Sequence, residues 1–122
     1  MGKMSLMKGK VGERELASEL RRLFKIDARR GRQYSGSPDS PDVITDLPIH
    51  AEVKRTERLS LYGSMKQAIS DAGENKVPVV FHRQNREDWL AIIRLNDLPE
   101  LIDSLSVIRE TQARPSVADD GN

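Results

Sequence analysis

The chain has 122 residues, enough for one domain with a single core and too few for a second globular domain. It has no cysteine and only two histidines, which excludes disulfides and thiolate zinc sites, and we expect any metal to be bound through oxygen. The formal net charge of +1 conceals an asymmetry, because residues 1–32 hold ten basic and four acidic residues while residues 95–122 hold two basic and six acidic ones. A basic N-terminal part predicts an anionic partner, with nucleic acid the first choice and a solvated charged surface the alternative.

Composition also bounds the two ends of the chain. No apolar run reaches the roughly 18 residues of a membrane span, and the N-terminus lacks the apolar core of a signal peptide, so we expect a cytoplasmic protein. Residues 1–7 are expected to be a loose lead-in. Residues 111–122 are polar and contain Pro and Gly, which predicts a disordered tail behind a single domain of residues 1–110.

The first predicted element is an amphipathic helix over residues 8–25. Glu13, Leu20 and Phe24 share one face of it, with Leu16 and Leu23 beside them. A carboxylate on an apolar face needs a partner, since an unpaired buried charge is costly. Two explanations stay open. Glu13 either forms a salt bridge or lies at the rim near the helix N-terminus, where the dipole favours an acid, or it reaches a metal site directly or through a water.

A basic segment and a turn-rich loop follow this helix. Residues 26–34 are predicted to form a strand with basic outward positions, and residues 35–40 a loop of Ser, Gly, Pro and Asp. The hydroxyl and backbone N–H groups of the loop, together with Arg30 and Arg32, could hold a DNA backbone. A plain flexible loop is the other interpretation.

Residues 40–55, SPDVITDLPIHAEVKR, carry the strongest signal for chemistry. They predict a short strand over residues 42–45, a turn at 46–48 and a second strand over 49–55. Because side chains alternate along a strand, the apolar residues of the second strand can face a core while Glu52 and Lys54 stand side by side opposite. Asp42 joins them on that face if the two strands pair.

Two carboxylates and an ammonium at one point suit the hydrolysis of a phosphodiester. Magnesium prefers oxygen ligands and usually takes one or two carboxylates from the protein, with phosphate and water as its other ligands. A nearby lysine steadies the attacking water or the developing negative charge. A solvated cross-strand ion pair is the alternative for Glu52 and Lys54, since 32% of the residues are charged and short motifs match by chance.

The rest of the chain again alternates helix and strand. Residues 61–72 predict a second helix that stops at Gly73, with Gln67 off its apolar face, toward solvent or a ligand. Residues 77–82 and 89–95 are apolar runs that predict a hairpin, or two strands buried by helices on both sides. A last helix is expected over residues 97–105, with Asn96 as its N-cap. The order α-β-β-β-α-β-β-α predicts an α/β fold with a small mixed β-sheet flanked by helices.

These motifs in this order resemble the PD-(D/E)XK nuclease superfamily, and within it the archaeal-type and phage Holliday-junction resolvases. The resemblance rests on the opening KGKVGERELASELRRLF, the basic strand, the Ser-Gly-Ser loop, Pro41-Asp42 and Ala51-Glu52-Val53-Lys54, and it spans residues 8–95. It implies a restriction-endonuclease-like fold. It also implies that Glu13 is the helix-borne acid of the site, that Asp42 closes the PD motif, and that Glu52 and Lys54 are the E-x-K pair.

Further roles come from the same resemblance. The backbone carbonyl of Val53 is implied as a metal ligand, and Gln67 resembles the Gln motif of related phage nucleases. Two other acids compete for the assigned roles. Asp39 also follows a proline, but Asp42 leads directly into an apolar strand. Glu15 lies close to Glu13 in sequence, but on the solvent side of the predicted helix.

The implied activity is that of a magnesium-dependent, structure-selective DNA endonuclease, specifically a Holliday-junction resolvase, in which manganese can replace magnesium. Asp42 and Glu52 would bind the metal with help from Glu13, Lys54 would position the water and Gln67 would orient it. Because a resolvase cuts two strands related by approximate two-fold symmetry, a homodimer is expected. The residues expected to contact DNA are Lys8, Lys10, Arg14, Arg30, Arg32, Ser35, Ser37 and Arg55.

Two other functions stay open. The chain could be another nuclease of the same superfamily, such as a nickase or a restriction-type enzyme. It could also be a non-catalytic DNA-binding module, although such a module has no use for clustered acids that face phosphate. A phage or prophage origin is suggested by the family likeness alone.

Overall fold

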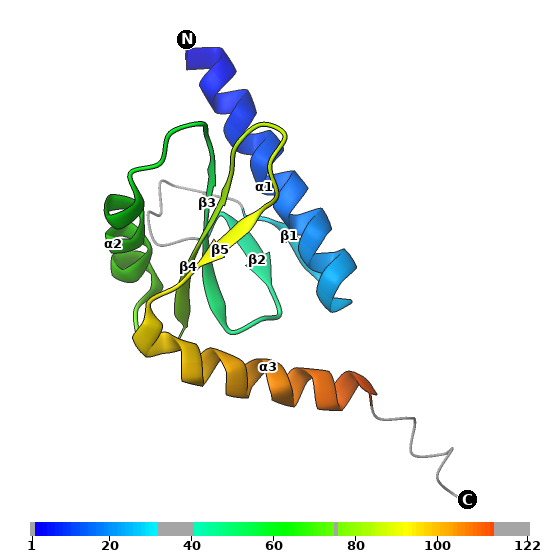
Figure 1. Cartoon of the computed structure of the whole chain (residues 1–122). Coiled ribbons are helices and arrows are strands. Elements are labelled where there is room, and N and C mark those ends of the chain that lie inside the picture. Colours follow the sequence, from blue (N-terminus) through cyan, green and yellow to red (C-terminus); the bar gives the residue numbers. More distant parts are fainter. Residues whose placement is uncertain (1, 32–40, 75, 114–122) are drawn as a thin grey trace, which may run out of the picture.

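The computed structural model describes residues 2–31, 41–74 and 76–113. Within them, a five-stranded mixed sheet is flanked by three α-helices in the predicted order α-β-β-β-α-β-β-α, which confirms the expected fold class (Figure 1). The elements are α1 (Gly2–Phe24), β1 (Ala28–Arg30), β2 (Val43–Thr45), β3 (Ile49–Arg55), α2 (Leu61–Ala72), β4 (Val77–Arg83), β5 (Leu90–Ile92), the short 3₁₀ helix η2 (Leu95–Asp97) and α3 (Leu98–Ala113).

The strands lie in the sheet in chain order, from β1 to β5. The first three form an antiparallel meander in which Val43 pairs with Ala51. β3 and β4 are parallel, with Arg55 opposite Arg83, and α2 forms the crossover between them. β4 and β5 pair antiparallel, so the two apolar runs form the predicted hairpin.

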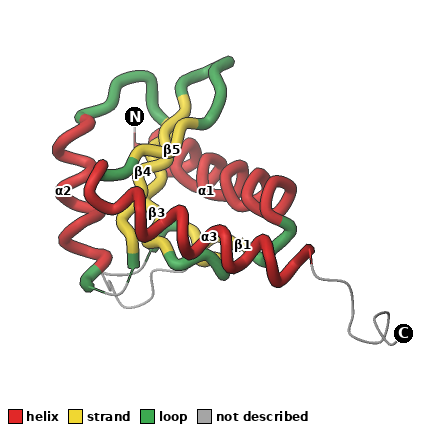
Figure 2. Tube along the Cα trace, turned by 60° about the horizontal axis from the view of Figure 1, so that its bottom comes forward, coloured by secondary structure: helices red, strands yellow, loops and turns green. Residues whose placement is uncertain are grey.

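Different helices bury the two faces of this sheet, and Figure 2 shows α1 and α2 on opposite sides of the strands. The larger core cluster joins α1 to one face, with α3 packed at its margin, and includes Leu16, Leu20, Ala51, Val79 and, partly buried, Leu105. The smaller cluster joins α2 to the other face through Met65, Ala68 and Val80. β4 contributes to both clusters, which explains why its sequence is a nearly continuous apolar run.

The two long helices extend beyond their predicted limits. α1 begins at Gly2, so the expected loose lead-in is wrong for residues 2–7, which contain no proline and several good helix formers. α3 continues past the predicted end at residue 105 to Ala113, two residues before Pro115. Residues 111–113 are therefore helical, and the rest of the predicted tail, residues 114–122, lies outside the described residues.

The strands at the two edges are shorter than predicted. β1 occupies three residues of the range 26–34, of which residues 32–34 lie outside the described part, and β5 occupies three residues of the range 89–95. Asn96 lies inside η2 and is not the N-cap of α3. The bounds of α2 are as predicted, and it ends at Gly73, whose φ of 71° is accessible to glycine at little cost. Among the helices in the described ranges, none is long and apolar enough to cross a membrane.

Candidate active site

β3 carries the predicted charged residues on the face that α2 covers. Ile49 and Ala51 are buried in the larger core on the α1 side, which confirms the predicted alternation. His50 and Glu52 point the other way, yet only 3% and 6% of their surfaces are exposed. A solvated surface ion pair therefore does not describe Glu52.

Asp42 lies immediately before β2 and is fixed against β3 by two hydrogen bonds. Its N–H donates to the carbonyl oxygen of Ala51 at 3.0 Å, and its Oδ2 accepts from the N–H of Val53 at 2.8 Å. These contacts lie on either side of Glu52 in the sequence of β3. The two acids that the sequence predicts as metal ligands are thus brought to one place.

Gly31 supports this position of Asp42, although no pattern within its own segment predicts such a role. Its N–H donates to the carbonyl oxygen of Asp42 at 2.8 Å. A β-carbon at Gly31 would overlap the carbonyl oxygen of Pro41. Only glycine therefore lets the end of β1 pass this close to the residues that precede β2.

Burial and neighbouring acids disfavour the charged forms of both carboxylates. The pKa of Glu52 rises from 4.5 to about 7, mainly because the side chain is desolvated and next because of the negative charges of Asp42 and Asp71, while Lys54 opposes the rise. The pKa of Asp42 is also raised, chiefly by burial and partly by Glu13, against the hydrogen bond from Val53. A carboxylate poised near neutral pH beside a second acid is typical of functional sites.

Lys54 is the cationic partner of this acid pair. Its Nζ lies 3.6 Å from Oε2 of Glu52, and its side chain is partly exposed. One ammonium does not offset the burial of two carboxylates, since the pKa of Glu52 stays raised in its presence. The site therefore has an excess of negative charge that a bound cation would relieve.

Glu13 reaches the same region from α1. Its Oε1 accepts from Nε of Arg30 at 2.7 Å, which confirms the predicted salt bridge for a carboxylate on the buried side of the helix. Its negative charge also contributes to the raised pKa of Asp42, so Glu13 lies near enough to influence the acid pair. Whether Glu13 binds a metal stays a prediction.

The other predicted residues surround this centre less closely. Gln67 is exposed on α2, and Lys10 and Arg14 are exposed on α1, as solvent- or ligand-facing residues should be. Arg55 is different, because its side chain is 12% exposed and its Nε lies 3.4 Å from Oε1 of Glu15. The side chain of Lys8, the loop residues Arg32, Ser35 and Ser37, and the competing acid Asp39 lie outside the described residues.

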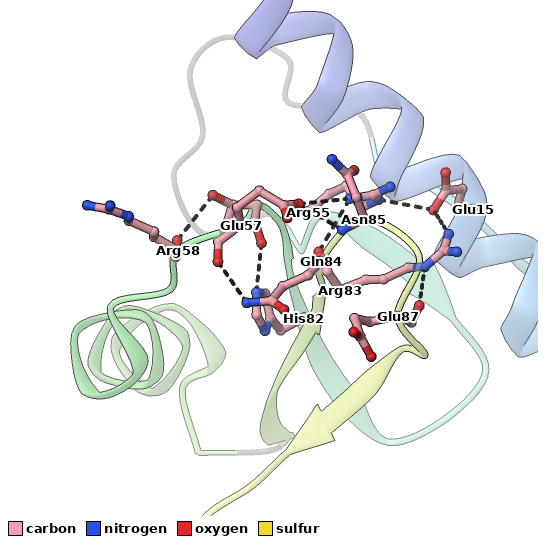
Figure 3. Close-up of polar contacts among 10 residues, drawn as sticks. Glu15, Arg55, Glu57, Arg58, His82, Arg83, Gln84, Asn85 and Glu87 are labelled. Atoms are coloured by element: carbon pink, nitrogen blue, oxygen red, sulfur yellow. Dashed lines mark hydrogen bonds and ion pairs between the residues drawn. The ribbon is translucent and has the colours of Figure 1, made fainter.

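Glu15 does not face solvent as predicted. It is half-buried, and its Oε1 accepts from Nη1 of Arg83 at 2.9 Å as well as pairing with Arg55. Figure 3 shows these arginines converging on Glu15 from the ends of β3 and β4. Because arginine side chains are long, they reach the flank of a helix that its own apolar periodicity assigns to solvent.

Hydrogen bonds of the same network connect the C-terminal ends of the parallel strands β3 and β4 (Figure 3). Glu57 binds the loop after β4, since its Oε2 accepts from the N–H of Asn85 at 2.7 Å and its carbonyl oxygen accepts from Gln84 at 2.8 Å. The Nε2 of His82 lies 2.9 Å from the carbonyl oxygen of Thr56. These contacts fix the C-terminal end of β3, directly after Lys54.

A third acid, Asp71 of α2, approaches Glu52 on β3. Ligand atoms of His50, Glu52 and Asp71 all lie within 4.8 Å of one another. A signal for Asp71 is present in the sequence: it lies three residues after Ala68 and seven after Ser64, both buried, so it shares their face of the helix. The expectation that only oxygen would be offered to a metal is incomplete, since this group includes an imidazole.

The chain matches no protein-family model, and the comparisons with curated proteins and with solved structures found no match. The functional interpretation therefore rests on the residues of the chain and their geometry.

Proposed function

We propose that this protein is a magnesium-dependent, structure-selective DNA endonuclease of the PD-(D/E)XK type, and specifically a Holliday-junction resolvase. The observation that carries the proposal is the pair of carboxylates formed by partly buried Asp42 and buried Glu52, with Lys54 at 3.6 Å from Glu52. Burying two like charges is costly. A site that retains them next to a lysine is better explained by catalysis on a phosphate than by stability.

The residues present fit a hard divalent cation. Asp42 and Glu52 offer carboxylate oxygens, and the carbonyl of Val53 is a further candidate ligand, which together make the donor set that magnesium prefers. Burial raises the pKa of Glu52 to about 7, and a bound cation would stabilise the ionised carboxylate in place of the proton. When bound, magnesium would polarise the phosphate and lower the pKa of the attacking water.

The protein side chains have separate tasks in this proposal. The N–H of Val53 holds the carboxylate of Asp42 in place. The Nζ of Lys54 can donate a hydrogen bond to the attacking water or to an oxygen that gains negative charge. Gln67 is exposed on α2 and would orient the water, and Glu13, held by Arg30, adds negative charge beside Asp42.

DNA would be held by the exposed basic residues on the N-terminal side. Lys10 and Arg14 are exposed on α1, where they are available to phosphate. No base-reading motif accompanies them, which favours recognition of backbone shape over sequence. We propose that such an enzyme acts in the cytoplasm, the location expected from the sequence.

Cutting two symmetry-related strands requires two sites, so we propose a homodimer. An apolar groove of about 440 Å³ between α1, β5 and α3, lined by residues such as Phe24, Trp89 and Leu101, supports an interface there. Leu95, Ile102 and Val107 are also exposed in this C-terminal part of the fold. These features agree with the expectation that the last strands or the last helix supply the interface.

The first test is nicking of a labelled synthetic four-way junction in magnesium, beside the corresponding linear duplex. The wild type is compared with Glu52→Gln and with Glu100→Gln, a matched change at an exposed position of α3. Paired symmetrical nicks on the junction alone, lost in Glu52→Gln and kept in Glu100→Gln, are expected. Equal cutting of the duplex would favour another nuclease of the superfamily, and tight junction binding without cutting in magnesium or manganese would favour the binding module.

A further inference from the structure

We propose that His50, Glu52 and Asp71 form a second cation site, which takes a divalent transition-metal ion such as Mn²⁺ and shares Glu52 with the Asp42 site. The existence of the site depends on geometry alone. Any influence on DNA cleavage rests on the proposed function, because Glu52 is common to both.

The geometry is that of a preformed ligand set. His50 and Glu52 are two residues apart on β3, so their side chains leave the strand on the same face. Asp71 comes from the last turn of α2, and the ligand atoms of all three lie within 4.8 Å of one another. Two packed elements therefore supply the donors, which holds them more firmly than a loop would.

The donor chemistry separates this site from the one at Asp42. An imidazole nitrogen binds manganese, zinc and related ions, whereas magnesium prefers a shell of oxygen ligands. Asp42 and Glu52 offer only oxygen, while the second group offers one nitrogen and two carboxylates. Glu52 can bridge the two because a carboxylate has two oxygens.

The surroundings make a cation favourable at this point. Glu52 has two other carboxylates near it: Asp71 in the same ligand group, and Asp42, whose Oδ2 accepts from the N–H of the neighbouring Val53. Beside it, Ala68 and Val80 are fully buried in the apolar cluster under α2, so water screens these charges poorly. A metal ion would neutralise the acids and join α2 to β3.

The histidine content allows a direct test. The chain has two histidines and no cysteine, so an imidazole signal from a bound metal must come from His50 or His82. Tag-free full-length protein is titrated with Mn²⁺, and pulsed electron paramagnetic resonance measures the coupling of the ion to imidazole nitrogen. The variants are His50→Gln, Asp71→Asn, Asp42→Asn and the matched controls His82→Gln and Asp103→Asn, the last at an exposed position of α3.

We expect imidazole coupling in the wild type, in Asp42→Asn and in both controls, and its loss in His50→Gln. Asp71→Asn should weaken Mn²⁺ binding at this site by at least about tenfold, since loss of an outer partner alone has that effect. No coupling in the wild type, or coupling that survives in His50→Gln and is lost in His82→Gln, would overturn the site. If His50→Gln does not fold, Asp71→Asn decides, and unchanged affinity overturns the site.

Failure of this inference and failure of the proposed function give different results. A protein that binds Mn²⁺ through His50 but cuts no DNA keeps the second site and overturns the nuclease. A protein that cuts junctions while its metal binding is unaffected by His50→Gln and Asp71→Asn overturns the second site alone.

Discussion

Replacement of Glu52 by glutamine should stabilise the metal-free protein at neutral pH. Glu52 has a raised pKa in the folded state, so the folded protein holds a proton there that the unfolded chain has released. The stability associated with this proton is fully present below about pH 4.5 and is lost as the pH rises through about 7. A rise of the pKa from 4.5 to about 7 corresponds to about 3 kcal/mol.

Glutamine stays neutral at every pH, so Glu52→Gln removes this loss. The free energy of unfolding of the variant should exceed that of the wild type by up to about 3 kcal/mol at pH 8, or on the order of 10 °C in the melting temperature. The two proteins should converge near pH 4.5. The side chain of Glu52 is 8% exposed, so solvent screening reduces this figure little.

The assay is urea unfolding in a chelator from pH 4.5 to 8.5, with Glu100→Gln as the control. The difference between Glu52→Gln and the wild type should grow through this range, while Glu100→Gln follows the wild type. Parallel pH profiles for Glu52→Gln and the wild type would refute the assignment of the buried charge to Glu52. Added metal should reduce the difference, because it stabilises only the ionised carboxylate.

Three further predictions test other parts of the structure. Gly12→Ala should destabilise the fold, because its β-carbon would lie 2.5 Å from that of Arg55, whereas Gly9→Ala in the same helix has open space and should stabilise by about 1 kcal/mol; thermal melts of the two variants should move in opposite directions. Glu15→Gln should lower the free energy of unfolding by about 1 kcal/mol, since it weakens the two partly buried ion pairs of Glu15 with Arg55 and Arg83. An unchanged urea midpoint would show that these ion pairs do not contribute to stability. Arg14→Gln should weaken junction binding and reduce the slope of log affinity against log salt by about one, as measured by fluorescence anisotropy, and an unchanged slope would remove Arg14 from the interface.

The sequence predicted best those features that depend on local periodicity. The alternation of β3 placed Ala51 in the core and Glu52 opposite, and α2 has its predicted limits because Gly73 ends it. The ends of α1 and α3 were missed for one reason. Residues 3–7 and 106–113 contain neither proline nor glycine, and such residues can continue a helix whether or not they face a core, so composition alone does not mark where it stops.

The features that could not be predicted from the sequence depend on contacts between elements that lie far apart in the chain. Asp71 becomes part of the site because α2 crosses over β3, and Glu15 is taken up by arginines that arrive from β3 and β4. The spacing within α2 places Asp71 on the face of Ala68 and Ser64, but it does not say which strand that face meets, and the contact of Glu15 has no signature within α1. Gly31 is similar, since the carbonyl that excludes a side chain there belongs to a residue ten positions later in the chain.

The charged face of β3 links stability to the proposed chemistry. An α/β fold needs the outer face of this strand to pack under α2, and Val80 and Ala68 show that apolar residues fill that layer well. Glu52 occupies the same layer beside Asp71, and the ionisation of Glu52, whose pKa is raised to about 7, lowers the stability of the metal-free protein above that pH. A cation reverses this effect because it replaces the proton that the folded state otherwise takes up. Metal binding should therefore raise the free energy of unfolding of the wild type more than that of Glu52→Gln. This difference should not depend on any DNA substrate.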